Sequence, residues 1–214
     1  MGRAAARAGR GGVRGALHRR AAGPVAWGGD AGRGRGGRRR AASGGRVVTA
    51  PDAPFAGWLE AWAETRRLTY DLLAALPYAV MNFSPHPDFG TFIRQIRHVG
   101  DVQRTFLVAL ASGQMPTWRG PRSRELERSR EEVAAYLRRL DAELTATLRA
   151  AGPGSGVREV RWGTEVVTVA RHLDRLLSHE VLHQGLWIFY AHIADLPLPA
   201  SWTQRWPGLA PPGP

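Results

Sequence analysis

Two histidines four residues apart carry the clearest chemical signal in the sequence. His179 and His183 stand one helical turn apart on a face that is otherwise apolar, so both imidazoles can reach a single metal ion. A lone histidine on such a face is usually structural, but two buried imidazoles without partners would cost about 1–3 kcal/mol each. His98 borders the apolar stripe of another predicted helix. We therefore predict a divalent-metal site at His98, His179 and His183, with positions open for water or substrate.

Other polar and aromatic residues lie close to these histidines in the predicted helices. Asp101, one turn after His98, is the candidate catalytic residue, as a proton acceptor or as a group that orients the ligand; the alternative is a solvated acid at the helix edge. His172 shares the face of the H-x-x-x-H pair and is predicted to be structural or to line the cavity. Trp187 and Tyr190 are predicted either to line a pocket or to pack in the core.

The H-E-V-L-H sequence at residues 179–183 also matches the zincin pattern H-E-x-x-H, in which Glu180 would be the general base. A zincin needs a third ligand downstream, and no Glu follows Glu180. The extended protease pattern would place a histidine where this chain has Phe189. Glu180 lies about 60–100° from the two histidines around a helix, so it could still approach the ion. A metal-dependent hydrolase is therefore a minor alternative.

Four helices are expected to position these side chains. Apolar residues at three- and four-residue spacings predict helices over residues 54–76, 88–111, 123–149 and 164–195. We expect Asp88 and Thr164 to be N-caps and Ser123 to open the third helix. An extended piece is expected at residues 157–162, without a hairpin. Four helices with mostly short links indicate an all-α four-helix bundle.

Positive charge is concentrated at the N-terminus. Residues 1–50 contain twelve Arg and one acid, whereas residues 51–214 contain eighteen Arg and seventeen acids. Having few large apolar side chains, residues 1–50 are predicted to be a disordered basic tail, and residues 51–214 the folded domain. The run G-R-G-R-G-G-R-R-R at residues 32–40 would suit RNA binding. An organelle-targeting peptide or an extension without function are the other interpretations of the tail.

Several absences restrict the function further. The chain has no cysteine, so it can supply neither a disulfide nor a thiolate nucleophile or ligand. No apolar run reaches the roughly 18–20 residues needed to span a bilayer, and no signal-peptide core is present. We expect a cytoplasmic protein without a membrane partner, acting on a small molecule and meeting nucleic acid only through the tail. A homodimer is a further expectation, although no exposed apolar stripe identifies its interface in the sequence.

Three segments of the chain resemble the DinB-like (DinB/YfiT-like) family of metal-binding bundles. They are F-S-P-H-P at residues 83–87 leading into Q-I-R-H-V-G-D at 95–101, H-E-V-L-H-Q-G at 179–185, and L-P-L-P-A-S-W at 196–202. The resemblance covers roughly residues 54–206.

The resemblance implies a four-helix bundle in which His98, His179 and His183 bind zinc, nickel, iron or a similar divalent ion. Relatives include thiol S-transferases and a mycothiol-dependent isomerase, in which the metal activates a low-molecular-weight thiol. For this chain it implies a metal-dependent thiol S-transferase acting on a small electrophile, with the thiol brought by the cosubstrate. The alternative is a metal-binding or stress-associated bundle without turnover. An RNA-associated role through the tail is a minor alternative.

Overall fold

The computed structural model describes residues 54–118 and 123–209, so the predicted tail at residues 1–50 lies outside the described part of the chain. The long helices are α1 (Ala56–Ala75), α3 (Phe92–Ser112), α4 (Arg130–Arg149) and α5 (Val169–Ile193). The short helices are α2 (Tyr78–Met81) and α6 (Ala200–Arg205), and the strands are β1 (Glu159–Trp162) and β2 (Glu165–Thr168). Short 3-10 helices lie at Pro87–Phe89, Arg124–Arg128, Ser155–Val157 and Pro207–Leu209.

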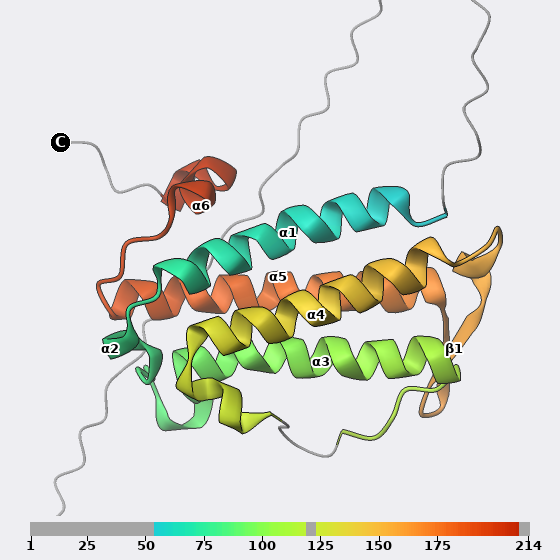
Figure 1. Cartoon of the computed structure of the whole chain (residues 1–214), viewed down its shortest axis with the longest axis horizontal. Coiled ribbons are helices and arrows are strands. Elements are labelled where there is room, and N and C mark those ends of the chain that lie inside the picture. The colour runs from blue at the N-terminus through green and yellow to red at the C-terminus, as the bar shows by residue number, and fades with distance from the viewer. Residues whose placement is uncertain (1–53, 119–122, 210–214) are drawn as a thin grey trace, which may run out of the picture. The chain divides into compact units, whose positions relative to one another are not determined.

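The four long helices of the described residues form a bundle, which confirms the all-α four-helix prediction. Each helix packs against two others, in the cyclic order α1, α4, α3, α5. Figure 1 shows that α3 and α4 run in the same direction and that α1 and α5 run opposite to them. The connection between α3 and α4 therefore returns along the length of the bundle, so the expectation of mostly short links was wrong for this pair.

Three of the four long helices begin at a Ser or Thr cap, but later than the sequence predicted. Asp88 lies in the Pro87–Phe89 turn, and α3 begins after Thr91, whose hydroxyl accepts a hydrogen bond from the Arg94 amide. Gly90, at φ 77°, separates the turn from the helix, because this left-handed conformation suits glycine. Ser123 does not open a long helix, and Ser129 caps α4 instead.

A β-hairpin precedes α5, where no hairpin was expected. β1 and β2 pair antiparallel, with Glu159 opposite Thr168 and Trp162 opposite Glu165. Gly163, at φ 62°, makes the tight turn, so Thr164 lies in the hairpin rather than at the start of the helix. Thr168 caps α5 by accepting a hydrogen bond from the Arg171 amide.

The buried apolar residues of the bundle form two clusters. One contains Leu72 and Leu73 of α1, Ile96 of α3 and Leu137 of α4, and the other contains Leu176 of α5. In the part of the chain that the structure covers, no helix combines the length and the apolar character that crossing a membrane requires.

Candidate metal centre

The structure brings the three predicted ligand histidines together between α3 and α5. One ring nitrogen of His98, one of His179 and one of His183 all lie within 4.8 Å of one another. The ring centroids are 5.4 Å apart for His98 and His179, 5.1 Å for His98 and His183, and 4.5 Å for His179 and His183. The i, i+4 spacing on α5 places two rings on one face of the helix, and the packing of α3 against α5 brings the third ring to them.

The donor set fits a divalent metal ion. For three atoms no more than 4.8 Å apart, some point lies within about 2.8 Å of all three, so small side-chain movements would reach the 2.0–2.1 Å of a Zn–N bond. The Nδ1 atoms of His179 and His183 are buried and have no hydrogen-bond partner among the described residues. A buried ring nitrogen left without a partner is costly, and a metal ion is one group that would satisfy such an atom.

Electrostatics keep these imidazoles neutral at physiological pH. Burial is the largest cause that lowers the pKa of His179 to about 3, and the neighbouring His183, His98 and Arg66 contribute to this shift in that order. Burial, with a contribution from His98, lowers the pKa of His183 to about 4. Burial is also the largest cause that lowers the pKa of His98. Neutral imidazoles offer a lone pair to a metal without first losing a proton.

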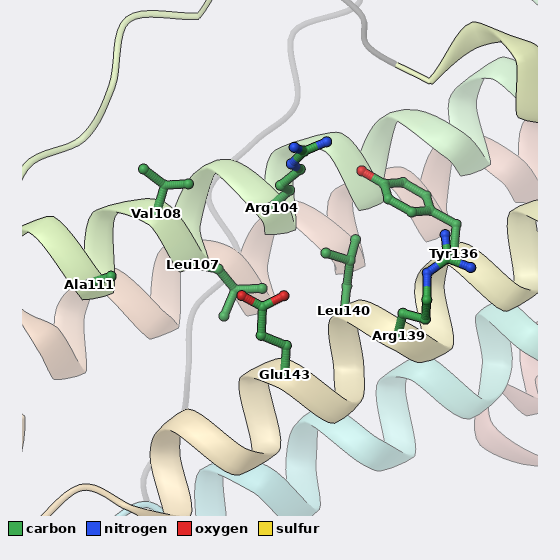
Figure 2. A pocket seen from close by; sticks show the side chains of 8 residues that line it. All are labelled: Arg104, Leu107, Val108, Ala111, Tyr136, Arg139, Leu140 and Glu143. Atoms are coloured by element: carbon green, nitrogen blue, oxygen red, sulfur yellow. The ribbon is translucent and has the colours of Figure 1, made fainter.

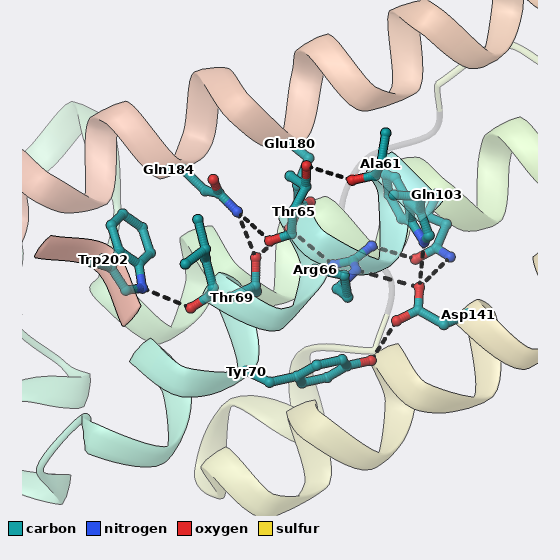
Figure 3. A network of polar contacts seen from close by, with 12 residues as sticks. Ala61, Thr65, Arg66, Thr69, Tyr70, Gln103, Asp141, Glu180, Gln184 and Trp202 are labelled. Atoms are coloured by element: carbon teal, nitrogen blue, oxygen red, sulfur yellow. Dashed lines mark hydrogen bonds and ion pairs between the residues drawn. The ribbon is translucent and has the colours of Figure 1, made fainter. Parts of the chain in front are cut away.

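The face of α5 that points toward α1 carries a different pair at the same spacing, Glu180 and Gln184 (Figure 3). The Glu180 carboxylate accepts hydrogen bonds from Arg66 at 3.1 Å and from Thr69 at 2.5 Å. The Gln184 amide donates to the Thr65 carbonyl oxygen at 2.7 Å. Glu180 is thus hydrogen-bonded to α1 and is absent from the histidine cluster, so the zincin interpretation loses its general base.

Arg66 is the centre of this buried polar network, which the sequence analysis missed. Its guanidinium also donates to the Gln103 side-chain oxygen of α3 at 2.7 Å, and its Nε lies 3.3 Å from Asp141 of α4, without hydrogen-bond geometry. Asp141 in turn accepts hydrogen bonds from Trp62, Tyr70 and Gln103. The network therefore links all four long helices (Figure 3).

Asp101 is buried, so the alternative of a solvated acid at the helix edge was wrong. Its carboxylate pairs with Arg97 and accepts a hydrogen bond from the Tyr136 hydroxyl of α4 at 3.1 Å. Arg97 also donates to Glu127 at 2.7 Å. The negative charge of Asp101 raises the pKa of His98, in opposition to burial, so this carboxylate acts electrostatically on the histidine.

The remaining predicted residues, His172, Trp187 and Tyr190, are buried. The His172 ring stacks on Phe106 at 4.4 Å, and its two nitrogens meet the Phe106 carbonyl and the Trp162 indole N–H, each at 3.1 Å. Trp187 and Tyr190 are buried in the core, as the alternative interpretation held. The Trp187 ring nevertheless lies 6.2 Å from that of His183.

Trp118 is a further aromatic residue at the site that the sequence analysis missed. It lies in the connection after α3, is about half exposed, and meets the His98 ring edge to face at 5.5 Å. An isolated tryptophan in a polar loop gives no periodic signal, so only the folded arrangement reveals this contact.

A half-open groove of about 560 Å³ lies between α3 and α4, and none of the three histidines lines it (Figure 2). Its floor includes Leu107 and Leu140, with Arg104, Arg139 and Glu143 around it. The groove is therefore separate from the candidate metal centre.

Comparisons with known proteins agree with this fold. The structure is similar to that of a DinB-like protein from Bacillus cereus ATCC 10987, with a TM-score of 0.56 and 17% identity over 67% of this chain and 95% of that chain. A DinB-like protein from Bacillus subtilis gives a TM-score of 0.53 and 14% identity, with the same coverage. Among curated proteins, none matches this sequence. The family model of the DinB superfamily matches residues 61–186, more than half of the chain and a range that contains all three histidines. The chain therefore belongs to the DinB superfamily.

Proposed function

We propose that the protein binds one divalent metal ion, such as zinc, nickel or iron, through His98, His179 and His183. We further propose that it is a transferase that uses this ion to activate a low-molecular-weight thiol, mycothiol-like in character, against a small electrophile. The observation that carries the proposal is the convergence of three neutral ring nitrogens within 4.8 Å of one another. Two of these histidines also have a buried nitrogen without a hydrogen-bond partner in the described chain.

Three protein ligands leave coordination positions open, which is typical of catalytic rather than structural metal sites. The cluster contains three imidazoles and no carboxylate among the described residues. When bound, a divalent ion would lower the pKa of a coordinated thiol and so provide a nucleophile at neutral pH. The chain has no cysteine, so a cosubstrate must bring the sulfur.

The remaining residues of the site have positioning roles in this proposal. Arg66 and Thr69 hold α5 through Glu180, which fixes the rotation of the helix that carries two of the ligands. Asp101 lies on the helix of the third ligand and raises the pKa of His98 electrostatically. Asp101→Asn should therefore weaken metal affinity or reactivity without removing the ion, since no ligand is lost.

Metal analysis of purified protein tests the first part of the proposal. Wild type should carry about one equivalent of metal after incubation with zinc or nickel and removal of the excess, and the His98→Ala/His179→Ala variant should carry less than about a tenth of that. His192 is an exposed histidine on the same helix outside the cluster, so His192→Ala is the matched control and should retain the metal. Equal, substoichiometric metal in wild type and double variant would refute the site.

A thiol conjugation assay tests the second part. Metal-loaded wild type should accelerate the disappearance of a thiol in the presence of an electrophile, and His183→Ala should lose the acceleration. Metal binding without acceleration would leave the alternative, a metal-binding bundle without turnover. Deleting residues 1–46 tests the RNA-associated role. Unchanged RNA affinity would remove this role, and a loss of affinity would support it.

A further inference from the structure

The groove between α3 and α4, which we call the α3–α4 groove, combines charged side chains with an apolar floor. Its volume of about 560 Å³ falls within the range of roughly 300–1,000 Å³ that is usual for small-molecule sites. The residues that line it are Arg104, Leu107, Val108, Ala111, Tyr136, Arg139, Leu140 and Glu143 (Figure 2). None of them belongs to the histidine cluster, so the ligand of this groove is determined by its own side chains.

The two ends of the α3–α4 groove differ in charge. Because α3 and α4 run in the same direction, residues two turns apart on each helix mark opposite ends, about 10 Å from one another. Arg104 and Tyr136 lie at one end, and Ala111 and Glu143 lie at the other. The Arg139 guanidinium also belongs to the first end, since its carbon lies 5.8 Å from the centre of the Tyr136 ring. Two cations therefore lie at one end and one carboxylate at the other.

These charged groups form no ion pair with another side chain in the part of the chain that the structure describes. Arg104, Arg139 and Glu143 are all exposed, and none of them takes part in a salt bridge there. A guanidinium that is bound to no acid keeps its N–H donors available for a carboxylate. The same two arginines repel the twelve arginines of residues 1–50, so that segment is a poor occupant of the groove.

The floor between the two ends is apolar. Leu107 and Leu140 are nearly buried, and the half-exposed Val108 adds to the apolar lining. An alkyl or aryl group laid along this floor would leave water and cover these side chains, whereas a strongly hydrated ligand would gain nothing from them. The floor therefore favours a ligand with an apolar body.

We propose that the α3–α4 groove binds an elongated organic monoanion, in its simplest form a medium-chain carboxylate. Its carboxylate lies between Arg104 and Arg139, and its apolar chain runs along Leu107 and Leu140. Glu143 restricts the ligand to a single negative end, because a second anionic group would meet this carboxylate at the far end of the groove. Charge thus selects the orientation of the ligand as well as its class.

Nuclear magnetic resonance of the isotope-labelled full chain tests the proposal, with octanoate, octanedioate and octanol as probes. Octanoate should shift the backbone amide signals of residues 104–111 and 136–143. Octanedioate should bind at least tenfold more weakly, because its second carboxylate faces Glu143. Octanol should also bind at least tenfold more weakly, because it lacks the charge that the two arginines recognise.

Variants of the charged residues test the roles of the two ends. Arg104→Gln/Arg139→Gln should raise the dissociation constant of octanoate at least tenfold. Arg149 and Arg158 are exposed arginines outside the groove, so Arg149→Gln/Arg158→Gln is the control for net charge and should not change it. Glu143→Gln should strengthen the binding of octanedioate and leave that of octanoate unchanged. Circular dichroism verifies that each variant is folded.

Several results would overturn the proposal. They are the absence of amide shifts with octanoate, shifts confined to surfaces outside the groove, equal octanoate affinity in the two double arginine variants, and equal affinity of wild type for octanoate and octanedioate. The His98→Ala/His179→Ala variant should bind octanoate as wild type does. A loss of binding there would place octanoate at the histidine cluster and would also overturn the proposal. Failure of the groove and failure of the metal site are therefore distinguishable.

Discussion

Breaking the buried ion pair between Arg66 and Glu180 should destabilise the bundle, and by an amount that depends on which partner is removed. Both side chains are 1% exposed. Arg66 donates to Glu180 and Gln103 and lies beside Asp141, whereas Glu180 accepts from Arg66 and Thr69. Removing the arginine leaves two acids without their shared cation. Removing Glu180 leaves the arginine with Asp141 and Gln103.

This asymmetry sets the expected magnitudes. Arg66→Met should lower the free energy of unfolding by about 3–5 kcal/mol, the usual cost of leaving a buried charge without its partner. Glu180→Leu should cost less, about 1–3 kcal/mol, because the guanidinium keeps other partners. The double variant should cost clearly less than the sum of the two, since the second substitution removes the group that the first one stranded.

Urea denaturation followed by circular dichroism measures these differences in metal-free protein. The exposed pair of Arg175 and Glu165, with hydrogen bonds of 3.0 Å and 2.6 Å, also involves α5 and serves as the control. Arg175→Met should change the unfolding midpoint little, because water screens the pair. Additive single effects, or an Arg66→Met cost no larger than that of the control, would refute the description of Arg66 as the centre of a coupled network.

The pH dependence of the Arg66→Met variant follows from Glu180. Burial raises the pKa of Glu180, and Arg66 is the largest influence that lowers it. Without Arg66 the folded state should therefore bind a proton at a pH where the unfolded chain does not. The variant should recover part of its lost stability as pH falls through this raised pKa. A difference in the free energy of unfolding between wild type and Arg66→Met that stays constant or grows on acidification would contradict this reasoning.

Three further outcomes are expected. Gly100→Ala should lower the free energy of unfolding by about 1–3 kcal/mol, since the new Cβ would lie 2.7 Å from a Tyr136 ring carbon, whereas Gly57→Ala, with nothing within 4 Å, should not. Burial lowers the pKa of His172 from 6.5, so the unfolded chain binds the proton more readily than the folded protein. The unfolding temperature should therefore fall as pH drops below about 6.5, and it should fall less steeply in His172→Gln. Removing the metal with a chelator should lower the unfolding temperature of a loaded sample, an effect absent from the His98→Ala/His179→Ala variant, while the helical circular dichroism signal is retained.

The helices, and the shared face of two of the three clustered histidines, were predictable because the helical period shows which residues lie on the same face of one helix. The i, i+4 spacing of His179 and His183 fixes their shared face, but the approach of His98 depends on the packing of α3 against α5. Helix starts were less predictable, because Gly90 and Gly163 adopt left-handed conformations that place a turn before the helix begins. Such turns carry little signal in a single sequence.

The burial of Arg66 and the exposure of apolar residues on α5 were both missed, because residue type was taken as a guide to burial. Arg66 follows Trp62 by four residues and precedes Thr69 by three, so its position on the buried stripe of α1 was visible in the sequence, although arginine is usually exposed. No exposed apolar stripe was expected from the sequence, but α5 exposes Val181, Leu182 and Phe189. Residues 186–191 are apolar or aromatic all round the helix, so the pattern does not separate the exposed side of α5 from its buried side.

The two inward faces of α5 together explain how the histidines of the candidate metal site are held in place without a metal ion. A rotation of α5 by one residue would carry His179 and His183 away from α3 and bring Glu180 and Gln184 toward it. The hydrogen bonds of Glu180 and Gln184 to α1 oppose this rotation, because they would be lost with no replacement in an apolar core. The rings are therefore held in place by contacts that no metal supplies, in contrast to small zinc domains that fold only on binding. Under the proposed function, little of the free energy of metal binding would be needed to order the three histidines.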